Sequence, residues 1–96
     1  MPAYVLGDIH VTDPAQFDTY RTPAGASIAQ YGGRMLAAGG NAELLDGWPV
    51  PELSIIIEFP DVAAARRWYR SPEYQGTALP IRLRSSQGRV FLIEGL

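Results

Sequence analysis

A β-branched segment at residues 53–59, reading LSIIIEF, constrains the fold of this chain more than any other stretch. A run that is nearly continuous in apolar residues is typical of a strand inside a sheet. Asp61 follows shortly after it, where its carboxylate can accept hydrogen bonds from the first amides of a helix. The sequence therefore predicts a buried strand that leads directly into a helix.

Residues 3–11 predict another strand, because side chains of different character alternate along them. One face is apolar and carries Val5, Gly7, Ile9 and Val11. The opposite face is mixed and carries Tyr4, Leu6, Asp8 and His10. A strand of this kind fits a sheet that has helices packed on one side only.

The segment after this strand predicts a helix that a proline interrupts. Asp13 can cap its first turn, and Pro14 suits its first position. Apolar and aromatic residues then recur every three or four positions up to Tyr31. Pro23 removes a backbone donor inside this run and clashes one turn back, at a cost of about 3 kcal/mol. We therefore expect a kink or break, with Thr22 capping a second helical segment.

Residues 34–38 and 89–94 predict two further strands, with an extended segment at residues 42–45 beyond a glycine-rich turn. The element order is then β-α-β-β-α-β, the ferredoxin-like arrangement of an α+β protein. Its helices cover one face of a four-stranded antiparallel sheet, in which the first strand lies between the third and the fourth. A chain of 96 residues forms a single domain, residues 1–96.

Ser71 and Pro72 predict a second helix start after the helix that Asp61 caps. Serine is a good cap, and proline fits the first helical position. This helix is expected to run to about Arg84, although Pro80 must disturb it.

The face of the sheet without helices needs a cover. It carries Tyr4, Leu6 and other apolar groups, which form a poor surface for contact with water. So short a chain buries only about 60–65% of the surface that it exposes when unfolded. No internal repeat supplies a second sheet, so a second copy laid face to face is the natural cover. We therefore predict a homodimer in which two sheets form an α/β barrel.

Composition argues against several functional classes. A net charge of −2 gives no basic surface for nucleic acid. The absence of cysteine excludes disulfides, thiolate catalysis and cysteine-ligated metals. The chain has a single histidine, and it lacks a GxGxxG or phosphate-loop motif. We therefore expect no metal and no cofactor. No signal peptide or membrane-spanning run is visible, so we expect a cytoplasmic protein that does not bind membranes.

With these elements assigned, the chain resembles the domain-of-unknown-function 1330 family of the dimeric α/β-barrel superfamily. The resemblance rests on MPAYVLGDIHVTDP, AQYGGRMLAAGG, LSIIIEFPDVAAARRWYRSPEYQ and GRVFLIEGL, which together cover nearly the whole chain. It implies a ferredoxin-like protomer and a homodimeric barrel, and no established activity. The wider superfamily includes cofactor-independent monooxygenases, muconolactone-type isomerases, haem-binding enzymes and polyketide cyclases.

His10 is the first candidate for chemistry. Asp8 leaves the same face of its strand, and Glu58 or Glu94 on the neighbouring strands is expected close by. A carboxylate beside an imidazole raises its pKa and fixes its tautomer, as acid–base catalysis requires. The alternative is a polar cluster that holds the dimer together, in which Arg34 or Arg89 pairs with the acids.

Aromatic residues on the predicted helices are the candidates for ligand binding. Trp68 and Tyr69 point about 100° apart on a helix, so one is expected to enter the core and the other to line a gap near Ser71 that Tyr74 closes. Arg34 could supply a charge for an acidic ligand. The candidate ligand-binding set is Tyr20, Tyr31, Arg34, Trp68, Tyr69 and Tyr74. The alternative is ordinary core packing, in which buried hydroxyl and indole groups find protein partners.

Two functions remain open from the sequence. The first is a homodimeric module that binds a small apolar or aromatic acid in a pocket between helices and sheet. The second is a cofactor-independent enzyme of monooxygenase, isomerase or cyclase type, which uses His10 with Glu58 or Asp8 for acid–base chemistry. A pocket that reaches His10 would favour the enzyme.

Overall fold

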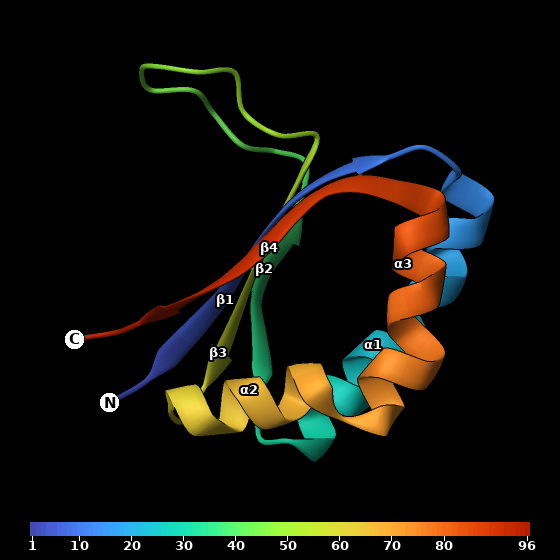
Figure 1. The fold of residues 1–96 in the computed structure, drawn as a ribbon. Coiled ribbons are helices and arrows are strands. Elements are labelled where there is room, and N and C mark those ends of the chain that lie inside the picture. Colours follow the sequence, from blue (N-terminus) through green and yellow to red (C-terminus); the bar gives the residue numbers. More distant parts are fainter.

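The computed structural model describes residues 1–96 as an α+β fold with helices on one face of a four-stranded antiparallel sheet (Figure 1). In chain order the elements are β1 (Ala3–Val11), α1 (Pro14–Gln30), β2 (Arg34–Gly39), β3 (Leu53–Phe59), α2 (Val62–Arg70), the π-helical turn η1 (Tyr74–Ala78), α3 (Leu79–Ser85) and β4 (Ser86–Glu94). The predicted ferredoxin-like fold is confirmed. A single protomer has an open sheet and not a closed barrel.

The strand order is β2-β3-β1-β4, so β1 lies between β3 and β4 as predicted. All neighbouring strands are antiparallel. Tyr4 lies opposite Glu58, whereas Asp8 lies opposite Ser54 on β3 and Arg89 on β4. Because paired residues point to the same face, this register decides which polar side chains can meet.

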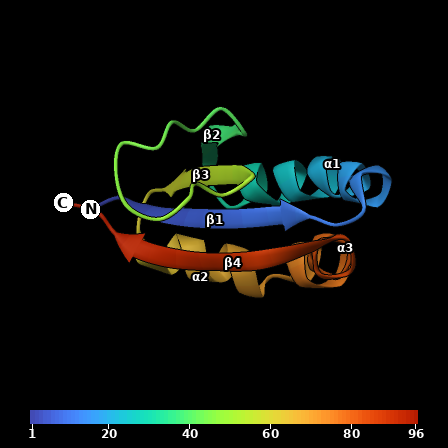
Figure 2. The same cartoon turned by 90° about the horizontal axis from the view of Figure 1, so that it is seen from above.

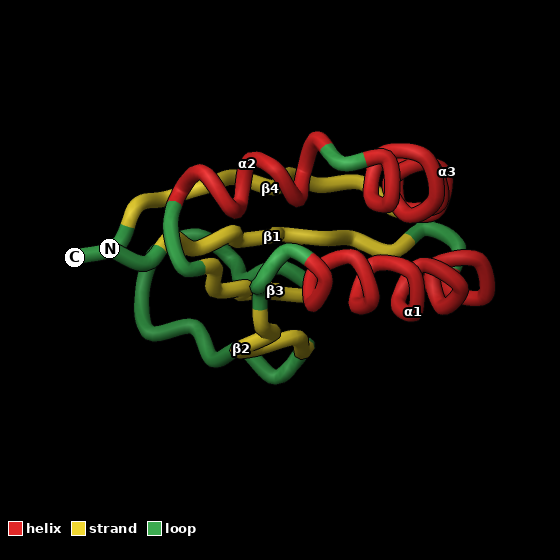
Figure 3. Tube along the Cα trace, turned by 90° about the horizontal axis from the view of Figure 1, so that it is seen from below, coloured by secondary structure: helices red, strands yellow, loops and turns green.

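The hydrophobic core fills the space between the sheet and the helices. α2 lies along β1 and β4, and α1 packs against η1 and α3 (Figure 3). Asp61 caps α2, as predicted, by accepting a hydrogen bond from the Ala64 amide at 2.8 Å. Trp68 is almost fully buried, and its ring centroid lies 5.4 Å from that of Phe59. Glycine is required at position 33, beside the Phe59 ring, because a Cβ there would lie 2.6 Å from Phe59 Cε1.

The predicted break at Pro23 is wrong, because α1 continues through this residue. Thr22 lies inside the helix and caps no new segment. Buried side chains on both sides of the proline, including Tyr20 and Ala24, hold the two halves of the helix on the same core. The carbonyl that loses its donor belongs to Thr19, which is exposed and open to water.

Residues 40–52 form a loop outside the sheet, so the extended segment predicted at residues 42–45 adds no strand. Pairing of β2 with β3 ends with Gly39 opposite Ser54, and Pro51 has no amide to continue the ladder. The loop projects from the end of β2 and β3 toward the side of the sheet away from the helices (Figure 1), and from above it runs across the strands (Figure 2). Trp48 on this loop is 91% exposed.

The chain between α2 and β4 is helical, as predicted. Ser71 Oγ accepts a hydrogen bond from the Tyr74 amide at 3.2 Å, which confirms the predicted cap. The helical run continues to Ser85, but the π-helical turn η1 interrupts its α-helical pattern just before Pro80, which lies in the first turn of α3. The predicted disturbance is therefore present. β4 begins at Ser86, earlier than predicted, and includes Gly88 with a φ of +147°.

The face of the sheet opposite the helices is uncovered in the protomer. Its apolar side chains come from β1, β3 and β4 and include Tyr4, Leu6, Ile56, Phe91 and Ile93. Phe91 is 40% exposed and Ile93 is 51% exposed. No helix of the chain combines the length and apolar composition that crossing a bilayer requires.

Candidate functional site

A cavity of about 180 Å³ lies between α2 and the sheet, beside β4. Its walls are mainly apolar and include Val5, Ala65, Trp68, Tyr69, Val90 and Leu92. Phe91 also borders the cavity, although its side chain belongs to the uncovered face of the sheet. Trp68 and Tyr69 divide as predicted, because Trp68 is buried in the core while Tyr69 is 38% exposed.

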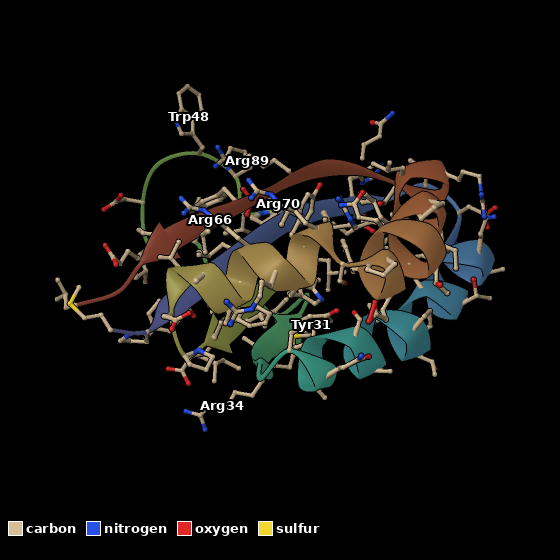
Figure 4. All side chains as sticks on the ribbon, turned by 60° about the horizontal axis from the view of Figure 1, so that its bottom comes forward. Tyr31, Arg34, Trp48, Arg66, Arg70 and Arg89 are labelled. Atoms are coloured by element: carbon tan, nitrogen blue, oxygen red, sulfur yellow. The ribbon has the colours of Figure 1, made fainter.

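Arg66 and Arg70 also line this cavity. Both project from the side of α2 that faces β4 (Figure 4). Neither forms a salt bridge or a side-chain hydrogen bond within the chain, so both guanidinium groups can bind a ligand. An apolar space with two free cations can accept a molecule that is apolar at one end and anionic at the other.

Tyr20 and Tyr74 do not line this cavity and belong to the core. Their hydroxyl oxygens lie 2.8 Å apart, and Arg82 Nε donates to the Tyr74 hydroxyl at 3.3 Å. Burial, reinforced by Tyr74, raises the pKa of Tyr20 well above its ordinary value, so its phenol stays protonated. Their polar atoms thus already have partners in the core, and neither tyrosine borders the cavity.

Trp68 likewise uses its indole nitrogen inside the protein. Its Nε1 donates a hydrogen bond to Ser27 Oγ on α1 at 3.0 Å. Only the apolar part of the ring is therefore left to contact the cavity.

Tyr31 lies on the side of α2 that faces α1, opposite β4 and away from the cavity (Figure 4). Its hydroxyl donates to Glu73 Oε1 at 2.9 Å, and Gln30 Nε2 donates to the same oxygen at 3.0 Å. The hydrogen bond to Glu73 raises the pKa of Tyr31, because ionisation would lose that donor. The second oxygen, Oε2 of Glu73, is buried and has no partner in the chain.

A second, shallower hollow of about 490 Å³ lies beside Tyr31. It is lined by Tyr31, Ala63, Arg66, Arg67 and Arg70. Arg66 and Arg70 thus border both the apolar cavity and this cationic hollow.

The expected grouping of His10 with Glu58 is wrong. Glu58 lies opposite Tyr4, six residues from His10 and so about 20 Å along the strand. Glu94 lies opposite Ala3, at the same distant end. His10 Nδ1 lies instead 2.7 Å from Glu52 Oε2, and both side chains are at least half exposed.

Asp8 and Glu58 each pair with an arginine on the uncovered face. Arg89 Nε donates to Asp8 Oδ2 at 2.9 Å, and Arg34 Nε donates to Glu58 Oε1 at 2.7 Å. The alternative raised from the sequence, in which Arg34 or Arg89 pairs with these acids, is thus present. Arg34 lies on the opposite side of the sheet from the apolar cavity and contributes no charge to it.

Glu52 is the residue that sequence reasoning missed. Ser54 pairs with Asp8, and side chains alternate along a strand, so residue 52 continues the same row toward His10. Counting back in steps of two from Glu58 places Glu52 on this face, and the register of β1 against β3 then brings it to His10. The pair borders a hollow of about 230 Å³ with Asp8, Pro51, Gln87 and Gly88 among its lining residues.

Solved structures with the same fold differ strongly from this chain in sequence. The RPA0582 protein of unknown function from Rhodopseudomonas palustris aligns with a TM-score of 0.78 at 20% identity, over 99% of this chain and 82% of that one. SnoaB, a cofactor-independent oxygenase from Streptomyces nogalater, aligns with a TM-score of 0.69 at 18% identity, over 99% and 93% of the two chains. A conserved protein from Methanosarcina mazei Go1 aligns with a TM-score of 0.61 at 14% identity, over 100% and 94%.

These similarities show that the chain is an α+β protein of ferredoxin-like fold. Residues 2–96 match the family model "Domain of unknown function (DUF1330)", and the chain belongs to that family. No curated protein matches the sequence significantly.

Proposed function

We propose that the protein is a homodimeric module that binds a small apolar or aromatic acid in the cavity between α2 and β4. The observation that carries this proposal is the combination of mainly apolar walls with the unpaired guanidinium groups of Arg66 and Arg70. A cavity of about 150 Å³ holds one benzene ring, so a space of 180 Å³ suits one aromatic ring or a short branched chain.

The uncovered face of the sheet supports the homodimer. The protomer exposes 6005 Å², whereas a compact monomer of this mass exposes about 5,400 Å². A standard interface buries about 800 Å² of each partner. Aromatic and aliphatic side chains at the centre of the open face, flanked by the Arg34–Glu58 and Arg89–Asp8 pairs, fit the apolar core and polar rim of such an interface.

Light scattering tests the dimer. At micromolar concentration we expect about twice the chain mass of 10.5 kDa. Ile56→Arg places an unpaired charge at the centre of the open face and should give a monomer. Leu83→Arg is the matched control, because Leu83 is 63% exposed on α3 and away from the sheet. A monomeric wild type that unfolds cooperatively would contradict the proposal.

Tryptophan fluorescence tests the ligand site. The chain has two tryptophans, so Trp48→Phe leaves Trp68 as the only reporter, in the wall of the cavity. In that background benzoate should change the emission, and benzyl alcohol should bind more weakly because it carries no charge. Arg70→Gln should weaken benzoate, whereas Arg84→Gln, on α3, should not. Equal affinities for benzoate and benzyl alcohol would refute the proposal that the ligand is an acid.

The contact between His10 and Glu52 favours a second candidate function, cofactor-independent acid–base catalysis. The carboxylate can hold the proton on Nδ1, which leaves Nε2 free to accept a proton from a substrate. Glu52 would then balance the charge of the imidazolium. The fold shared with a cofactor-independent oxygenase supports this only as an analogy.

His10→Gln separates the two roles of this contact. If the site is catalytic, the variant keeps the wild-type dimer dissociation constant and loses oxygen uptake with a panel of phenols and 1,3-diketones. If the contact only holds the dimer together, the dissociation constant rises instead. Wild-type protein without activity on the panel, and an unchanged dissociation constant in His10→Gln, would refute both roles.

A further inference from the structure

Three arginines of α2 have no acidic partner, although the chain as a whole is acidic. Arg66, Arg67 and Arg70 all lie in its last turns, and no carboxylate lies within ion-pair distance of them. By contrast, Arg21, Arg34 and Arg89 each face an aspartate or glutamate. The helix dipole favours cations at this end, but like charges one turn apart repel. Helix stability alone does not account for three of them.

Two hollows border these arginines, and they share two lining residues. Arg66 and Arg70 line the apolar cavity, and the same two residues line the shallow hollow together with Arg67 and Tyr31. A ligand seated with its apolar end in the cavity therefore has its polar end beside Arg66 and Arg70, and Arg67 lies in the adjoining shallow hollow. A single carboxylate can engage one guanidinium in a bidentate pair and leaves the other two unpaired.

We propose that the ligand of this site carries a phosphate group attached to its apolar part. This inference rests on the proposed function, because it assumes that the apolar end occupies the cavity. A phosphate monoester offers three terminal oxygens and close to two negative charges at neutral pH, which matches several neighbouring unpaired arginines better than a carboxylate does. Arg66 and Arg70 hold the phosphate at the mouth of the cavity, and Arg67 contacts it from the shallow hollow beside Tyr31.

The first experiment compares phenyl phosphate, benzoate and inorganic phosphate in the Trp48→Phe background, with Trp68 fluorescence and calorimetry. Phenyl phosphate should bind about tenfold more tightly than benzoate, the effect of one or two additional charge-assisted hydrogen bonds. Its affinity should rise between pH 5 and pH 7.5, because phosphate gains its second charge near pH 6. Benzoate, which stays ionised over this range, should show no such rise.

The second experiment uses Arg67→Gln, with Arg84→Gln as the matched control. Arg67 borders the shallow hollow beside Tyr31 and does not line the apolar cavity. Its loss should therefore weaken the binding of phenyl phosphate and leave the binding of benzoate unchanged, while Arg84→Gln should change neither affinity. Equal affinities for phenyl phosphate and benzoate, or an equal effect of Arg67→Gln on both, would overturn the inference.

Failure of the proposed function has a different signature. If phenyl phosphate and inorganic phosphate bind equally well and benzoate does not bind, the arginines form an anion site and the cavity holds no ligand group. That result refutes the combined ligand and the proposed acid-binding cavity together. Tight benzoate binding without a preference for phenyl phosphate refutes the phosphate alone.

Discussion

Ser27→Ala tests the packing that supports the cavity wall. Ser27 is almost fully buried on α1. Its hydroxyl donates to the Ala24 carbonyl at 2.8 Å and accepts from Trp68 Nε1 at 3.0 Å. The substitution removes a single oxygen and leaves the indole N–H buried without a partner, because no other acceptor contacts it in the chain.

The expected loss follows from this unpaired donor. A buried donor without its acceptor costs about 1–3 kcal/mol. The bond to Ala24 adds little, because that carbonyl lies inside α1, where the helix supplies its own hydrogen bonds. For a domain of this size each kcal/mol lowers the melting temperature by about 4–8 °C. We therefore expect Ser27→Ala to melt at least about 4 °C below the wild type.

Urea unfolding at several protein concentrations measures the effect apart from dimerisation, which changes apparent stability with concentration. Thr22→Ala, exposed on the same helix, is the matched control and should cost nothing. Trp68→Phe completes a double-mutant cycle, because it removes the donor itself. A loss below about 0.5 kcal/mol for Ser27→Ala, or no coupling between the two substitutions, would refute the reasoning.

Two further predictions concern the backbone. Pro23→Ala restores an amide inside α1 and should stabilise the protein by about 1–2 kcal/mol in urea unfolding, less than the full helix penalty of proline because the unfolded chain also gains freedom. A destabilised variant would contradict this. Gly88→Ala should cost at least about 2 kcal/mol, because its Cβ would lie 1.9 Å from the Asp8 carbonyl oxygen at a positive φ. Gly76→Ala, which meets nothing within 4 Å, is its control, and equal melting temperatures would refute the argument.

Local signals were sufficient to predict most of the fold. Each of three signals acts within a few residues of its own position, and all three are present: the cap at Asp61, the cap at Ser71 and the β-branched run of β3. Pro23 misled the prediction because its local penalty is outweighed by core contacts on both sides, which come from distant parts of the chain. Tertiary packing of this kind is not visible in one stretch of sequence.

The candidate site was harder to predict, because it depends on register and side-chain direction. Alternation placed Asp8 and His10 on the correct face, but only the offset between β1 and β3 decides that Glu52, and not Glu58, reaches His10. For the aromatic residues, the sequence identified Trp68 and Tyr69 beside a helix–sheet cavity. It did not identify Arg66 and Arg70, because charged residues on the outside of a helix usually interact only with solvent.

β4 connects the two proposals about assembly and ligand. Alternate residues of this edge strand serve the two faces of the sheet: Val90 and Leu92 line the cavity, while Ile93 lies on the open face. A partner sheet that orders β4 therefore also orders one wall of the cavity. Binding and dimerisation would then be linked, and the factor by which the dimer tightens the ligand must equal the factor by which the ligand tightens the dimer. Such coupling needs no contact between the ligand and the second subunit, because the strand between them carries it.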